Sequence, residues 1–219
     1  MATRWKTLSL RHAPSQADAD LVLVSGPPFV CAGSELHADR VLDALGRVHF
    51  SARPGETLDL IPETAARRRV VVLGTGAKTP ASECEWLSTG GFLVEAMSRH
   101  RLASIRIPER RLLGDDSHFE QLVLGALLHS FQLAKGASAR TDCESREALV
   151  ICGGDRALAE RASQSALAIN RARAWIEAPA NLLTPPTWCE EARQVFAARG
   201  ARVLVLGPPE LERLGGVPG

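Results

Sequence analysis

The chain has 219 residues, of which 45% are hydrophobic and 23% are charged, and this balance excludes disorder as its main state. Lys and Arg number 26 against 25 Asp and Glu, giving a formal net charge of +1. That balance excludes a strongly basic nucleic-acid footprint and an acidic tail. No apolar run reaches the ~18 residues of a membrane span, and residues 1–6 lead into no apolar signal core. The sequence therefore predicts a cytoplasmic protein without membrane association.

Six short apolar runs are typical of β-strands, and several are apolar on consecutive residues, as in strands covered on both faces. They lie at 21–24, 57–61, 70–73, 103–107, 148–152 and 202–206. Five cysteines without a C-x-x-C pair argue against a disulfide framework or a thiolate zinc site.

Helical patterns separate these runs. They cover 37–45, 82–100, 117–134, 155–176 and 184–200. Ser117 and Glu120 have the spacing of a capping box, Asp155 can cap the fourth helix, and Thr184-Pro185 suits the start of the fifth. Strands that alternate with helices predict an α/β fold with a mixed, mostly parallel sheet flanked by helices.

The organisation changes after residue 153. Residues 1–153 contain a complete α/β pattern, 154–180 form a long linker helix, and 181–219 contain only one helix, one strand and a short helix. A lone strand cannot bury both faces, so this last part predicts the first elements of an incomplete second α/β domain. Its strand at 202–206 would have an unpaired edge that can pair with another chain.

A glycine-containing loop follows the third strand. Gly74, Thr75 and Gly76 lie between that strand and a helix, where exposed backbone amides can bind a phosphate. The spacing fits neither the P-loop nor the dinucleotide-binding fingerprint. A tight strand-to-helix turn is the favoured explanation of the same residues.

A second polar group combines Asp115, Asp116 and His118, which could hold a metal or relay a proton. The alternative is a polar loop followed by the first turn of a helix, where acidic residues favour the helix dipole. The basic run Arg67–Arg69 could contact a phosphate backbone, although such a run before a strand also suits a solvated loop.

Residues 173–185 read R-A-W-I-E-A-P-A-N-L-L-T-P. This segment resembles the junction motif of the leucyl aminopeptidase family, also called cytosol aminopeptidases, at the entry to the catalytic domain. The matching positions are Pro179, Asn181, Thr184 and Pro185, whereas Glu177 stands where the family usually has Asn. Weaker similarities at 53–58, 71–76, 125–133 and 210–215 extend the resemblance over essentially the whole chain.

The resemblance implies a macro-domain-like fold for the N-terminal domain. It also implies that the complete enzyme removes N-terminal residues, preferably leucine, from peptides, using two divalent metals (Zn, Mn or Mg) to activate water. The family's metal-binding motifs do not occur in these 219 residues. No catalytic residue, metal ligand or cofactor is therefore predicted in this chain, which is expected to be inactive alone.

The expected role is assembly or regulation. The partners implied by the resemblance are the catalytic domain of the same enzyme and further copies in a hexamer, with peptides as substrates of the complete enzyme. Two alternatives remain open. One is a nucleotide-binding module that takes ADP-ribose at Gly74–Gly76. The other is a DNA-binding accessory domain that uses Arg67–Arg69 together with Arg106, Arg110 and Arg111.

Overall fold

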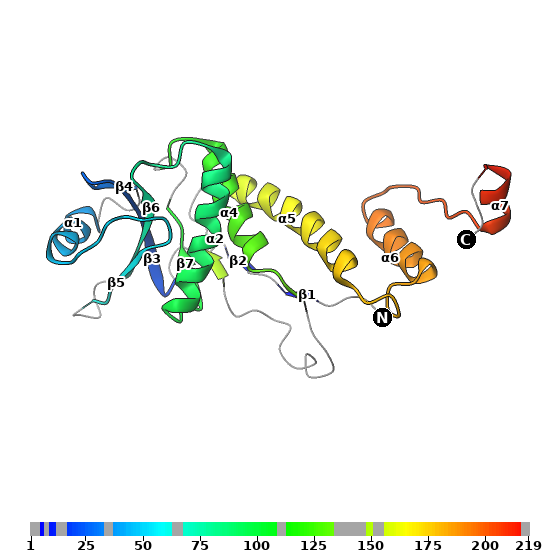
Figure 1. The fold of residues 1–219 in the computed structure, drawn as a ribbon, viewed down its shortest axis with the longest axis horizontal. Helices are drawn as coiled ribbons and strands as arrows, with labels where there is room; N and C mark the ends of the chain where they lie inside the picture. Colours follow the sequence, from blue (N-terminus) through cyan, green and yellow to red (C-terminus); the bar gives the residue numbers. More distant parts are fainter. Residues whose placement is uncertain are drawn as a thin grey trace. The chain divides into compact units, whose positions relative to one another are not determined.

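The computed structural model describes residues 5–6, 9–11, 17–32, 37–62, 68–108, 113–133, 148–150 and 156–215. The chain divides into two compact units, one of Arg4–Arg173 and the other of Ala174–Gly219 together with Met1–Thr3 (Figure 1).

The first unit is built on a seven-stranded, mostly parallel sheet. Six strands follow the order β2-β9-β7-β3-β6-β5, and β4 pairs with β3. Neighbours from β2 to β6 are parallel, whereas β5 is antiparallel to β6 and β4 is antiparallel to β3. The bounds are β2 Ser9–Arg11, β9 Ala148–Val150, β7 Ser104–Arg106, β3 Ala19–Ser25, β6 Arg69–Gly76, β5 Thr57–Leu60 and β4 Val30–Ala32. A separate antiparallel pair joins β1 (Trp5–Lys6) to β8 (Gln132–Leu133).

Helices cover both faces of this sheet. On one face lie α2 (Glu83–Arg99), α4 (Asp116–His129) and α5 (Arg156–Glu177), and on the other lies α1 (Ala38–Arg47) (Figure 1). Successive residues of β3 and β6 alternate between the two hydrophobic clusters, as the pleat requires. The larger cluster receives Leu21, Leu23, Val71 and Leu73, and the smaller receives Val22, Val24, Val70 and Val72.

This arrangement confirms that the consecutive apolar runs at 21–24 and 70–73 are strands buried on both faces. Each fully buried valine or leucine contributes about 1.5–3 kcal/mol relative to an exposed one. The predicted α/β fold with a mostly parallel, helix-flanked sheet is therefore confirmed for this unit.

Two glycines allow α2 and α4 to pack in close contact. A Cβ on Gly90 would lie 2.2 Å from the carbonyl oxygen of Leu122, and one on Gly125 would lie 1.9 Å from that of Leu87. Both distances are far inside van der Waals contact, so the backbones approach where only glycine fits.

Two details of the predicted third helix are wrong. Its N-cap is Asp115, whose side chain accepts the backbone N–H of Ser117 at 2.7 Å, rather than Ser117 itself. The helix also ends at His129 instead of continuing to 134, because the chain turns at Ser130 and enters β8. Asp155, the predicted cap of the next helix, lies outside the described residues.

The second unit contains α6 (Pro185–Ala197) and α7 (Pro208–Arg213). The strand predicted at 202–206 is wrong, since residues 201–207 adopt no regular secondary structure. A strand needs a partner edge for its backbone hydrogen bonds, and no described residue offers one to this segment. Among the described helices of both units, none combines the length and apolar character that a bilayer crossing needs.

Candidate functional site

The predicted phosphate-binding loop lies at the end of β6, against the turn at residues 52–56. The backbone N–H of Gly74 donates to the carbonyl of Glu56 at 2.8 Å, and that of Gly76 donates to Ala52 at 2.7 Å. A Cβ on Gly74 would lie 2.4 Å from the carbonyl oxygen of Arg53. Gly74 therefore serves a close backbone contact, and two amides of the loop already have acceptors. A ligand-binding role for Gly74, Thr75 and Gly76 remains a prediction.

The helix after this loop is capped by its own side chains. Glu85 accepts the backbone N–H of Ala81 at 2.7 Å and that of Ser82 at 3.1 Å, while the Ser82 hydroxyl accepts the N–H of Glu85. These donors hold the pKa of the Glu85 carboxyl below its ordinary value, with the Ala81 amide as the main cause. The positive end of the α2 dipole therefore already faces a carboxylate.

The structure gives the second predicted polar group separate roles. Asp115 caps α4, and the N–H of Ser117 lowers its pKa. His118 places Nδ1 2.8 Å from the carbonyl oxygen of Leu113 and stacks on the buried Trp86, with ring centroids 5.0 Å apart. In the part of the chain that the structure describes, no three His, Cys, Asp or Glu side chains form a metal-binding group.

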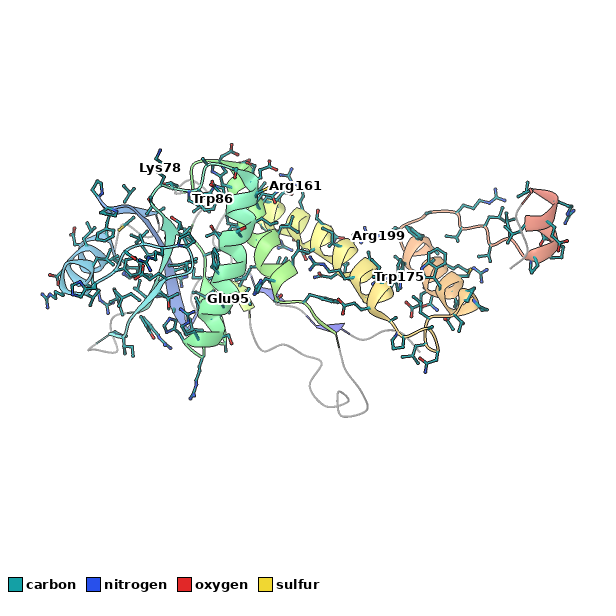
Figure 2. The ribbon with its side chains drawn as sticks, viewed as in Figure 1. Lys78, Trp86, Glu95, Arg161, Trp175 and Arg199 are labelled. Carbon is teal, nitrogen blue, oxygen red and sulfur yellow. The ribbon has the colours of Figure 1, made fainter. Side chains whose placement is uncertain are left out.

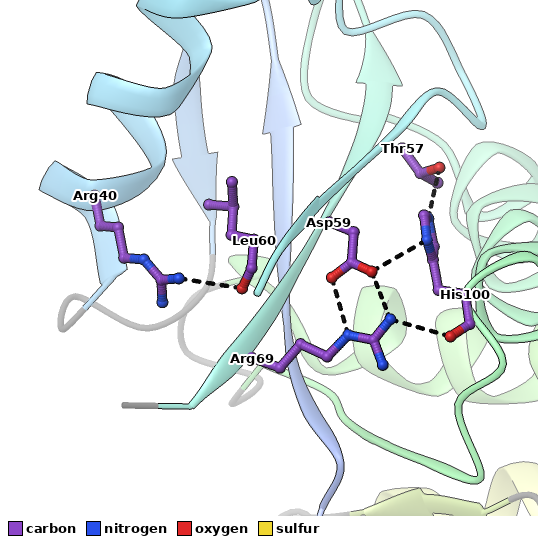
Figure 3. Close-up of polar contacts among 6 residues, drawn as sticks. All are labelled: Arg40, Thr57, Asp59, Leu60, Arg69 and His100. Atoms are coloured by element: carbon purple, nitrogen blue, oxygen red, sulfur yellow. Dashed lines mark hydrogen bonds and ion pairs between the residues drawn. The ribbon is translucent and has the colours of Figure 1, made fainter. Parts of the chain in front are cut away.

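Arg69, the last residue of the basic run and the first of β6, pairs with an acidic residue that no sequence pattern singles out. Arg69 donates from Nε to Oδ1 of Asp59 at 2.9 Å and from Nη2 to the carbonyl of His100 at 3.1 Å (Figure 3). Arg69 lowers the pKa of Asp59, and burial lowers that of His100. His100 also reaches the hydroxyl of Thr57, at 2.9 Å from Nε2. This cluster fastens the end of α2 to the sheet edge.

A second ion cluster surrounds Asp20, whose side chain is only 9% exposed. Its carboxylate lies 3.0 Å from Nε2 of His37, 3.4 Å from Nε of Arg106 and 3.8 Å from Nη1 of Arg68. Three described arginines that could have contacted DNA, Arg68, Arg69 and Arg106, therefore each lie beside a carboxylate. Arg67, Arg110 and Arg111 lie outside the described residues.

The junction motif forms the turn that leads into α6. The carbonyl of Pro179 accepts the N–H groups of Leu182 at 2.8 Å and Leu183 at 3.0 Å. Thr184 is the N-cap, Pro185 is the first helical residue, and Asn181 is exposed. These conformations suit the motif because proline at the first helical position needs no hydrogen-bond acceptor. A structural role for Pro179, Asn181, Thr184 and Pro185 remains a prediction.

Two tryptophans near this turn contact each other. The rings of Trp175 and Trp188 lie 6.0 Å apart in an edge-on arrangement, and the indole N–H of Trp175 donates to Glu191 at 2.7 Å. The second unit nevertheless leaves many large apolar side chains in solvent. They are Ile176, Leu182, Trp188, Phe196, Leu204, Val205, Leu211 and Leu214, with Ile176 83% and Leu204 76% exposed. The buried apolar side chains among its described residues are Ala174 and Ala192.

Comparison with known proteins finds sequence relatives that cover most of the chain. No family model matches the chain. A probable cytosol aminopeptidase of Brucella anthropi is 25% identical over 93% of the chain, and one of Acidovorax sp. is 29% identical over 96%. The chain spans about 43% of the length of the first relative and 42% of the second.

Solved structures agree in fold. A tomato leucine aminopeptidase mutant superposes with a TM-score of 0.69 at 17% identity, covering 98% of this chain and 47% of its own. The bottromycin maturation enzyme BotP superposes with a TM-score of 0.68 at 21% identity, covering 91% and 41%, and was also solved in complex with Mn. The fold is thus the mixed α/β fold found in aminopeptidases. The chain is thus similar in sequence to curated cytosol aminopeptidases over most of its length, which confirms the resemblance inferred from the sequence.

Proposed function

We propose that this chain is the non-catalytic portion of a leucyl aminopeptidase and that it serves assembly or regulation of the complete enzyme. The complete enzyme would be cytoplasmic, would remove N-terminal residues, preferably leucine, from peptides, and would form a hexamer. Within the chain, residues 1–153 would be the N-terminal domain, 154–180 the linker helix, and 181–219 the first elements of the catalytic domain.

The exposed apolar surface of the second unit carries this proposal. Among its described residues, eight large hydrophobic side chains are exposed, whereas the buried apolar side chains are two alanines. Burying apolar surface yields roughly 25 cal/mol per Å², so covering these side chains would be strongly favourable. Exposed apolar surface of this extent is typical of a binding interface. The occupant that fits is the remainder of an aminopeptidase, because the relatives are more than twice as long as the part matched.

In the described part of this chain, no group of three or more His, Cys, Asp or Glu side chains could bind the two divalent metals of the family. The metals would therefore be held by the catalytic portion, and this chain would carry out no step of the hydrolysis. The manganese complex of BotP supports a metal-dependent reaction for a protein with this fold, without identifying the metals of the enzyme proposed here.

The test joins this chain to the part of the Brucella anthropi relative that it does not match. Hydrolysis of leucine anilide is measured with manganese or zinc, for the chain alone and for the joined protein. We expect no turnover from the chain alone and metal-dependent turnover from the joined protein. Turnover by the chain alone, or a folded joined protein without activity, would contradict the proposal.

A matched pair of variants tests the docking surface itself. Leu204→Glu places a charge on the exposed apolar surface, and Gln194→Glu introduces the same charge at an exposed polar position of α6 in the same unit. In the joined protein, the first change should strongly reduce activity and the second should leave it nearly unchanged. Equal effects of the two variants would argue against a docked apolar surface.

A further inference from the structure

A groove of about 510 Å³ lies in the first unit, lined by residues of α2 and α4 and by Arg173 of α5. Its apolar lining comes from Leu87, Phe92 and Leu128. Glu95 and Arg173 also line it, so both signs of charge are present. A volume of this size falls within the ~300–1,000 Å³ range of small-molecule sites.

The lining of the groove depends on small residues. Gly91 and Gly125 both line it. A Cβ on Gly91 would lie 3.1 Å from Nδ1 of His129, and one on Gly125 would clash with the backbone of Leu87. Side chains at these positions would occupy space between the helices. The close packing of α2 on α4 therefore also sets the space that a ligand could enter.

The positive group of the groove is held in place before any ligand arrives. Nη1 of Arg173 donates to the carbonyl of Leu128 at 3.0 Å and to Oδ1 of Asn170 at 3.3 Å. Asn170 is itself fully buried and donates to the carbonyl of Leu127 at 3.2 Å. An anchored guanidinium loses little freedom when it binds a carboxylate, and its planar fork suits that partner.

The negative group is Glu95, in the C-terminal half of α2 (Figure 2). Its Oε1 lies 3.5 Å from Nε2 of His129, and both side chains are about half exposed. An exposed pair at this separation contributes little to stability. The Glu95 carboxylate can therefore exchange this contact for a ligand cation at small cost.

We propose that this groove binds a short zwitterionic peptide with an apolar side chain. The ammonium group of the peptide contacts Glu95, its carboxylate contacts Arg173, and its side chain packs against Leu87, Phe92 and Leu128. A ligand with one charge would leave one of the two groups uncompensated, and a larger apolar ligand would use neither. The site goes beyond the proposed function, since it places peptide recognition on the portion assigned no catalysis, where it would sense substrate or product.

The test is calorimetry on the 219-residue chain with leucyl-leucine, its N-acetyl form, its C-terminal amide and glycyl-glycine. We expect leucyl-leucine to bind, and each of the other three to bind at least fivefold more weakly, because each lacks one of the three contacts. Absence of heat with millimolar leucyl-leucine would overturn the proposal, and so would equal affinities for the free and blocked peptides.

Variants locate the site. Arg173→Gln and Glu95→Gln should each weaken leucyl-leucine about tenfold, whereas Arg47→Gln, on the exposed part of α1, should leave binding unchanged. Unchanged binding in both groove variants would overturn the assignment. If Arg173→Gln fails to fold, the comparison of leucyl-leucine with its blocked forms on the unaltered chain still tests the proposal. The assay needs no catalytic portion, so its failure is separable from failure of the proposed function.

Discussion

Arg69 and Asp59 lie on neighbouring antiparallel strands and form a two-point ion pair, in which Nε and Nη2 of the guanidinium both donate to the carboxylate. The Asp59 side chain is 16% exposed and that of Arg69 is 27% exposed, so water screens the pair only partly. The same guanidinium also binds the carbonyl of His100 at the end of α2. One side chain thus joins two strands and a helix.

Replacing this guanidinium should destabilise the first unit. We expect Arg69→Met to lower the free energy of unfolding by about 2 kcal/mol, because the two-point charge-assisted pair is lost and Asp59 is left with His100, whose Nδ1 lies 3.4 Å away. Urea unfolding measures the change. Arg47→Met is the matched control, since its partner Asp43 is 62% exposed, and its effect should stay below about 0.5 kcal/mol. Similar losses in both variants would contradict the assigned role of the pair.

Acidification should destabilise the unit through His100. Burial lowers the pKa of His100 below its ordinary value of 6.5, against the attraction of Asp59. The unfolded chain therefore binds a proton more readily, and stability falls as the pH drops from 6.5 toward the lowered pKa. His100→Gln can keep the contact with Thr57 without titrating. The difference in stability between the unaltered chain and the variant should shrink between pH 7 and pH 5, and parallel curves would refute this account.

Alanine substitutions at two helical glycines, Gly125 and Gly46, should change stability in opposite directions. Gly125→Ala should cost about 2–3 kcal/mol, because its Cβ would lie 1.9 Å from the carbonyl oxygen of Leu87. Gly46→Ala, in α1, meets no atom within 4 Å and should stabilise by about 0.5–1 kcal/mol through helix propensity. Thermal unfolding of both variants compares them directly. An unchanged unfolding temperature of Gly125→Ala would show that α2 and α4 can move apart at little cost and would contradict this account.

The loop at residues 74–76 can be tested with its proposed ligand. We expect calorimetry with millimolar ADP-ribose to give no binding heat, because the amides of Gly74 and Gly76 already donate to backbone carbonyls. Adenine nucleotides without the second ribose are the control for weak, unspecific binding. Saturable binding of ADP-ribose that is lost in Gly76→Val would instead support the nucleotide-binding alternative.

Local patterns in the sequence were sufficient to predict most of the first unit. Consecutive valines at 70–72 indicate a strand buried on both faces, and the structure confirms it. The strand predicted at 202–206 is wrong because apolar content alone does not supply a pairing edge. Contacts between distant residues could not be predicted either. The pairing of Asp59 with Arg69, and the space between Gly91 and His129, depend on how helices and strands meet in three dimensions.

The unpaired segment at 202–206 has a consequence for its backbone as well as for its side chains. Its five residues include no proline, so each carries both a donor and an acceptor, and no described residue binds them. Water satisfies these groups only while the segment stays open. A polypeptide that covers Leu204 and Val205 with apolar surface alone would leave these backbone N–H and C=O groups without hydrogen-bond partners. The covering partner must therefore present an unpaired β-strand edge, so that residues 202–206 form backbone hydrogen bonds with it and add a strand to its sheet.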